Sequence, residues 1–111
     1  FAMDKWFAVP VLGEQFHPIG LPNKGSLNFP WPGLDYDLKP SVAEALAVRA
    51  DRVARYRDFI SSVTADDLTQ AIDVLENGEH PMLACLHTVI EEEFWHHRYA
   101  VRDLALLEAA K

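Results

Sequence analysis

Acidic residues and histidines that could bind a metal ion are concentrated in one short run of the sequence. Glu91, Glu92 and Glu93 are followed closely by His96 and His97. This run contains the spacing Glu-x-x-x-His twice, as Glu92/His96 and as Glu93/His97. On a helix, residues four apart share a face, so a carboxylate oxygen and an imidazole nitrogen can reach the same ion. The run therefore predicts a metal site, provided that it is helical.

The pattern around this run is typical of one long helix from Pro81 to Ala110. Asn77-Gly78 predicts a turn before it, and proline suits a first helical position because its missing N–H needs no partner there. No other glycine or proline interrupts the segment. With an advance of about 100° per residue, its apolar side chains fall on one face, which is expected to pack inward: Leu83, Leu86, Ile90, Phe94, Val101 and Leu104.

Only one of the two Glu/His pairs is expected on that inward face. His97 lies close to its centre and Glu93 roughly 40° away, whereas Glu92 and His96 are expected to be exposed. We therefore predict Glu93 and His97 as metal ligands. The alternative is a buried His97 that hydrogen bonds to Glu93 without metal, because a buried carboxylate needs a proton or another positive partner.

The rest of the chain predicts two further helical segments and a long loop. Phe1–Val9 resembles the end of a helix, and residues 13–40 are too rich in proline and glycine for regular structure. A helix is predicted over Ser41–Ser62, because Ser41 and Glu44 have the spacing of a capping box. The connection after it has extended character around residues 71–75.

One arginine breaks the amphipathic pattern of the second helix. Arg49 lies near the middle of its apolar stripe, so it should have an acidic partner, or it binds a substrate carboxylate. Cys85 should lie opposite the packed face of the last helix, and we assign it no role. The two long helices are expected to run antiparallel and to touch through Leu46, Val53, Ile60, Leu86, Ile90 and Val101.

Length, composition and charge narrow the class of protein. The 111 residues, half of them hydrophobic, with a net charge of −7, predict one small soluble domain. The ten Lys and Arg residues are scattered, which argues against a nucleic-acid surface. No long apolar segment or signal peptide is present, so we expect no membrane partner and a cytoplasmic location.

Three sequence segments resemble one family. LHTVIEEEFWHHRYAVRDLALLE at Leu86–Glu108, DKWF near the start and FHPIGLPNKGS in the loop are similar to bacterial DinB-like proteins, which are related to the mycothiol-dependent maleylpyruvate isomerase. The resemblance implies an all-α, up-and-down four-helix bundle with an internal metal site. Glu93 and His97 match the ligand pair of the fourth helix in such proteins.

The resemblance also implies that residues 1–111 are a single DinB-like domain that is N-terminally incomplete and lacks the first helix. The first metal-binding histidine of such proteins would fall before Phe1, so a third ligand is expected from His17, an upstream segment or another chain. His87 is excluded, because it lies roughly 15 Å from His97 along the helix axis.

Two functions follow from the resemblance. One is a transferase or isomerase that uses a divalent metal, zinc or nickel, and a low-molecular-weight thiol such as mycothiol. In this function Arg49 would bind a small-molecule substrate, and no catalytic residue is assigned. The alternative is a non-catalytic metal-binding or dimerisation module. In either case the incomplete bundle leaves an open groove, which we expect to be filled by preceding residues or by a second copy in a homodimer.

Overall fold

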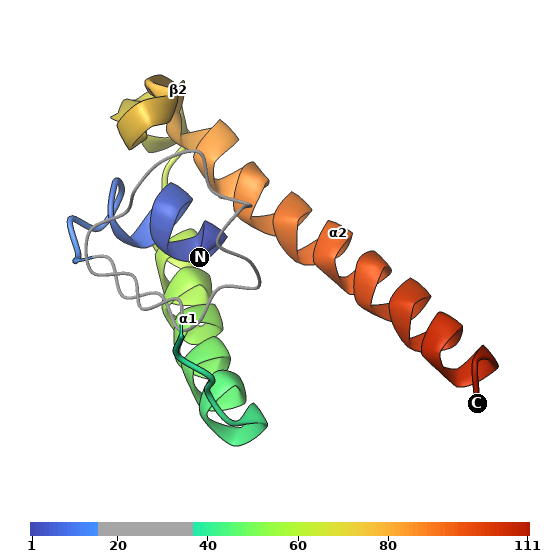
Figure 1. Cartoon of the computed structure of the whole chain (residues 1–111). Helices are drawn as coiled ribbons and strands as arrows, with labels where there is room; N and C mark the ends of the chain where they lie inside the picture. Colours follow the sequence, from blue (N-terminus) through green and yellow to red (C-terminus); the bar gives the residue numbers. More distant parts are fainter. Residues whose placement is uncertain (16–36) are drawn as a thin grey trace.

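Two long helices are the main elements of the chain (Figure 1). The computed structural model describes residues 1–15 and 37–111. Helix α1 spans Val42–Ser62 and helix α2 spans Met82–Ala109, close to the predicted ranges. The chain is thus mainly helical, in agreement with the predicted all-α class. The four-helix bundle and its missing first helix stay predictions. Most of the loop predicted over residues 13–40 lies outside the described residues, as does His17.

Local sequence signals explain where the two helices begin. The Ser41 hydroxyl accepts a hydrogen bond from the Glu44 backbone N–H at 3.2 Å, and the Glu44 carboxylate accepts one from the Ser41 N–H at 2.8 Å. This confirms the capping box. The Ser41 hydroxyl also donates a 2.7 Å hydrogen bond to the Glu44 carboxylate, and this bond, together with the one from the Ser41 N–H, lowers the pKa of Glu44. Pro81, predicted as the first helical residue, is the N-cap residue of α2, so the helix begins one position later, at Met82.

Short elements precede α1 and connect it to α2. The N-terminal segment contains η1, a short π-helix, and the connection contains two 3₁₀ turns, η3 and η4, and the strands β1 and β2. Their bounds are Asp4–Ala8 for η1, Asp67–Thr69 for η3, Ala71–Asp73 for β1, Leu75–Asn77 for η4 and Glu79–Pro81 for β2.

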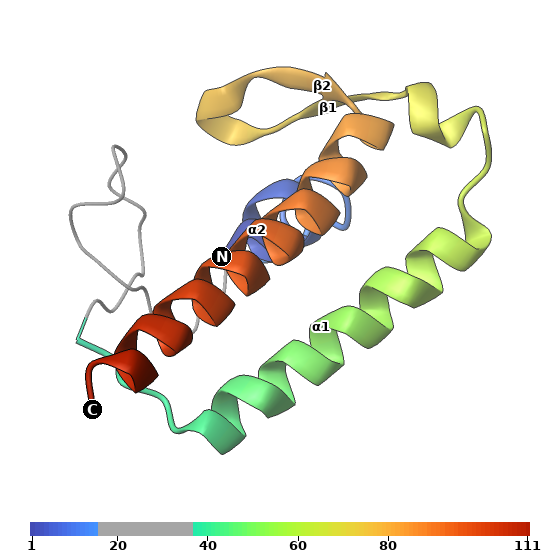
Figure 2. The same cartoon turned by 90° about the vertical axis from the view of Figure 1, so that its right-hand side faces the viewer.

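The two strands form an antiparallel hairpin at one end of the helices (Figure 2). Ile72 pairs with His80, and Val74 between the strands is fully buried. Gly78 has φ +74°, a backbone conformation that favours glycine, and its carbonyl accepts a hydrogen bond from the Val74 N–H. The sequence predicted extended character in this connection but not the hairpin.

The core lies where the N-terminal segment packs against both helices. The Phe7 ring contacts the Tyr56 ring of α1 edge-on, with centroids 5.1 Å apart. The Tyr56 hydroxyl donates a 2.7 Å hydrogen bond to the Leu86 carbonyl of α2, which ties the two helices together. The buried cluster comprises Phe7, Tyr56, Met82, Leu86 and Val89.

The predicted contact between α1 and α2 is largely wrong. The helices run in opposite directions but diverge away from the hairpin end (Figure 1). Only Leu86 of the six expected contact residues belongs to the buried core, Val53 is half-buried, and the others are exposed. The reason is that α2 packs with a different face, which carries Met82, Cys85, Leu86 and Val89. The exposed members of the predicted contact are Leu46, Ile60, Ile90 and Val101.

Candidate functional site

Glu93 and His97 lie one turn apart on α2, beyond the part of the helix that is packed. Every residue from Glu93 to Lys111 is exposed. The expectation that Glu93 and His97 are buried is therefore wrong for this chain on its own. Its cause is the divergence of α1 and α2 away from the hairpin end (Figure 1), so that within residues 1–15 and 37–111 no helix packs along the second half of α2.

An ion pair connects this part of α2 to α1. Arg49 Nη2 lies 2.5 Å from Glu93 Oε2, with the two side chains 58% and 47% exposed. The expectation that Arg49 needs an acidic partner is confirmed. At this exposure the pair contributes little stability, about 0–1 kcal/mol. Its effect is to orient Glu93. Among the described residues only Oε2 of this carboxylate has a hydrogen-bond partner, so Oε1 is available there to a further ligand.

The neighbouring histidines of α2 have carboxylate partners. His96 Nε2 lies 3.2 Å from Glu92 Oε2, and His87 Nδ1 lies 3.5 Å from Glu91 Oε2. His96 is exposed, as expected, but Glu92 is half-buried rather than exposed. His97 differs from both, because the described part of the chain offers it neither a hydrogen bond nor an ion pair.

The Glu93/His97 pair supplies two of the ligands that a metal ion needs. No hydrogen bond joins Glu93 to His97 within the described residues, so the alternative of a closed Glu–His pair has no support. Over residues 1–15 and 37–111, no group of three or more His, Cys, Asp or Glu side chains could hold a metal ion. A carboxylate oxygen and an imidazole nitrogen suit zinc or nickel, but a third ligand has to come from elsewhere.

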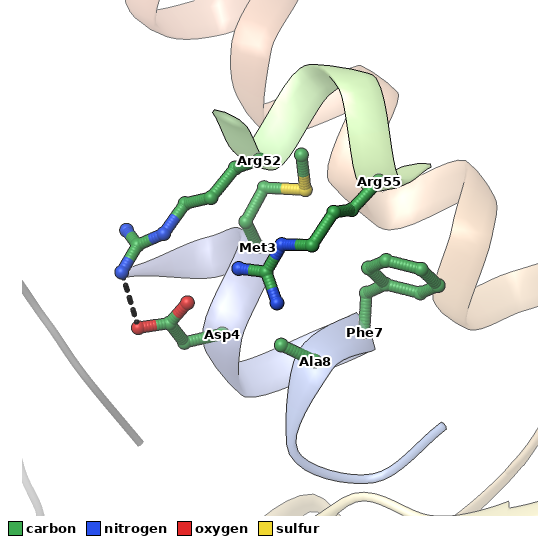
Figure 3. A pocket seen from close by; sticks show the side chains of 6 residues that line it. All are labelled: Met3, Asp4, Phe7, Ala8, Arg52 and Arg55. Atoms are coloured by element: carbon green, nitrogen blue, oxygen red, sulfur yellow. Dashed lines mark hydrogen bonds and ion pairs between the residues drawn. The ribbon is translucent and has the colours of Figure 1, made fainter. Parts of the chain in front are cut away.

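A second cluster of charges lies between η1 and α1 (Figure 3). Asp4 is only 2% exposed, and its Oδ2 lies 3.0 Å from Arg52 Nη2. Nearby, Arg55 forms ion pairs with Glu14 and with Asp51. The small hollow that these arginines help to line also contacts Met3, Phe7 and Ala8.

This second cluster carries no excess of positive charge, so it is best explained as the attachment of the N-terminal segment to α1. Acidic Asp4, Asp51 and Glu14 face the two arginines, which leaves no excess positive charge for an anionic ligand. Sequence analysis did not identify this cluster. A usable signal was present, because Asp4 is a lone acidic residue among Met3, Trp6 and Phe7.

Cys85 is fully buried on the packed face of α2, not opposite it as predicted. Burial raises the pKa of its thiol, because the thiolate would lose its hydration. A thiol held in its neutral form is a poor nucleophile. Cys85 is therefore part of the core.

The chain is mainly helical and carries the Glu93/His97 pair on its last helix, α2. The family model described as the DinB superfamily matches residues 4–100, and the chain belongs to this superfamily. No curated protein and no solved structure matches the chain. Among the described residues, no helix is both long enough and apolar enough to cross a membrane.

Proposed function

We propose that the chain binds a divalent metal ion through Glu93 and His97 and serves as a metal- and thiol-dependent transferase or isomerase. The observation that carries the proposal is the pairing of the α2 histidines. His87 and His96 are each engaged by a carboxylate, whereas His97 is free of such a partner among the described residues. One turn away, Glu93 keeps Oε1 available for a second bond to the ion.

The roles of the individual residues follow from their chemistry. Glu93 and His97 would hold zinc or nickel, and an ion bound there would supply a positive charge that keeps a thiol cofactor deprotonated. Arg49 orients Glu93 through Oε2. Because its guanidinium group is 58% exposed and permanently charged, Arg49 can also bind the carboxylate of an anionic substrate.

The metal content of variants distinguishes the Glu93/His97 pair from the neighbouring Glu92/His96 pair. The wild-type protein is dialysed against zinc or nickel, freed of excess ion and examined by elemental analysis, together with His97→Ala, Glu93→Gln and His96→Ala. We expect His97→Ala and Glu93→Gln to lose the bound ion and His96→Ala to keep it. His96→Ala is a matched control, because it removes the same side chain from the adjacent position of the same helix.

The result that contradicts the proposal is equal metal content in His97→Ala and His96→Ala, or loss of metal with His96→Ala alone. The enzymatic part has a separate test, transfer of a low-molecular-weight thiol to a small electrophile by the metal-loaded protein. In that assay Arg49→Ala should retain metal and raise KM for an anionic substrate. Retained metal without any thiol transfer supports the second candidate, a non-catalytic module.

A further inference from the structure

The turn that joins β1 to β2 (Figure 2) contains the only Asn-Gly step of the sequence, Asn77-Gly78. Both residues are exposed, and within the described part of the chain no hydrogen bond engages the Asn77 side-chain amide. A Cβ at Gly78 would meet no atom within 4 Å, so the space beside its nitrogen is open. An unengaged side-chain amide followed by an unhindered main-chain nitrogen supplies both reacting groups of asparagine deamidation.

In the closed turn the Gly78 nitrogen is not free to react. Its N–H donates a 3.2 Å hydrogen bond to the Leu75 carbonyl, and the Asn77 N–H donates one of 2.9 Å to the Val74 carbonyl. Leu75 itself has φ +50°, a left-handed conformation that is unfavourable for leucine. Relief of this strain offsets part of the free energy that opening the turn costs, so local opening is easier than unfolding of the core.

We propose that Asn77 is a site of spontaneous deamidation whose rate is set by the opening of this turn. In the open turn the Gly78 nitrogen loses its proton and bonds to the side-chain carbonyl carbon of Asn77, and the side-chain nitrogen leaves as ammonia. Water then opens the resulting five-membered imide. Attack of water at the former main-chain carbonyl gives isoaspartate, and attack at the former side-chain carbonyl gives aspartate. Either route consumes one water and releases one ammonia.

The products change both the charge and the length of the turn. Each replaces a neutral amide by a carboxylate, in a hairpin where Asp73 already lies opposite Glu79. Additional negative charge there destabilises the strand pair further. Isoaspartate also adds one carbon to the main chain, which disturbs the 2.9 Å hydrogen bond from the Val74 N–H to the Gly78 carbonyl. Deamidation should therefore loosen the hairpin around Val74, which is fully buried in the native chain.

The same hairpin holds the N-terminal segment in place. Lys5 Nζ lies 2.6 Å from Glu76 Oε1, and the Trp6 ring meets the His80 ring edge-on, with centroids 5.3 Å apart. Both partners of the N-terminal segment lie within three residues of Asn77. Deamidation is therefore a slow and irreversible change that weakens this attachment. The inference does not rest on metal binding, because the turn contains no member of the proposed metal pair.

Deamidation rates test the control by the turn. The full chain is incubated at mildly alkaline pH, and isoaspartate and aspartate at position 77 are measured by peptide mass spectrometry. The native chain should react about tenfold more slowly than the chain in urea, because the closed turn protects the nitrogen. Leu75→Gly should slow the native reaction about threefold, because glycine adopts φ +50° without strain. Leu38→Gly, at a leucine of similar exposure outside the hairpin, 43% against 42%, should leave the native rate unchanged.

The structural consequence has its own measurement. The deamidated chain carries an additional negative charge, so ion exchange separates it from the unmodified chain. Its Val74 amide hydrogen should exchange with solvent about tenfold faster. Asn77→Gln, whose longer side chain closes an imide far more slowly, should keep the original exchange rate after the same incubation. The inference is overturned if the native chain does not deamidate while the unfolded chain does, if both react at the same rate, if Leu75→Gly is no slower than wild type, or if Val74 exchange is unchanged.

Discussion

The ion pair between Asp4 and Arg52 should stabilise the fold far more than the pair between Arg49 and Glu93, although both join α1 to another element. The two arginines lie three positions apart on the same helix. The side chains of Asp4 and Arg52 are 3% and 13% exposed, against 47% for Glu93 and 58% for Arg49. Removing one partner of a buried pair takes a main counter-charge away from a poorly hydrated site and costs about 3 kcal/mol.

The matched variants are therefore Arg52→Met and Arg49→Met, which keep much of the side-chain volume and remove the charge. A domain of this size has about 5–15 kcal/mol of stability, so a loss of about 3 kcal/mol is a large fraction. Arg52→Met should lower Tm by about 12 °C or more, and Arg49→Met should cost less than about 1 kcal/mol. Urea unfolding followed by circular dichroism and tryptophan fluorescence measures both.

A double replacement separates loss of charge balance from loss of packing. Asp4→Leu combined with Arg52→Met removes both charges, and replacement of a buried ion pair by apolar side chains is often neutral. We expect the double variant to recover most of the stability that Arg52→Met loses. Equal costs for Arg52→Met and Arg49→Met, or no recovery in the double variant, would refute the argument that burial decides the strength of these pairs.

Two further predictions concern buried groups whose pKa is raised. Tyr56→Phe should cost about 1 kcal/mol at neutral pH, because it removes the hydrogen bond to the Leu86 carbonyl. Burial raises the pKa of Tyr56, so the unfolded chain loses that proton first, and wild-type stability should fall above about pH 10, less steeply in Tyr56→Phe. Cys85 is buried and its pKa is raised, so its thiol should not react with a disulfide reagent in the native protein and should react fully in guanidinium chloride. Fast labelling of the native protein would contradict the burial of Cys85. A wild-type pH profile in Tyr56→Phe would contradict the role given to Tyr56.

Features fixed by neighbouring residues were predictable from the sequence. The capping box of Ser41 and Glu44 and the bounds of both long helices depend on contacts within a few positions, and these expectations are confirmed. The sequence also predicted that Arg49 pairs with an acidic residue, because a charged residue inside an apolar stripe needs an opposite charge. Its identity, Glu93, depends on how two distant segments meet.

The packed face of α2 was not predictable from its periodicity, because the first half of the helix is apolar on two sides. Leu83 and Ile90 belong to one side, and Met82, Cys85 and Val89 to the other. The second side is buried because η1 and the hairpin pack against it, and no local pattern encodes that choice. The exposure of Glu93 and His97 follows from this choice.

The open face of α2 decides how strongly the proposed metal pair can act. His97 lies among exposed apolar side chains such as Phe94 and Val101, and Glu93 borders them on the side toward α1. An element that covered this face would remove water from both side chains, and a lower effective dielectric constant would strengthen every charge interaction of Glu93. The ion pair with Arg49, weak while exposed, then becomes a stronger constraint on the carboxylate. A histidine enclosed on the same face also gains more from a bound cation than one in open water, because water no longer competes for its nitrogen.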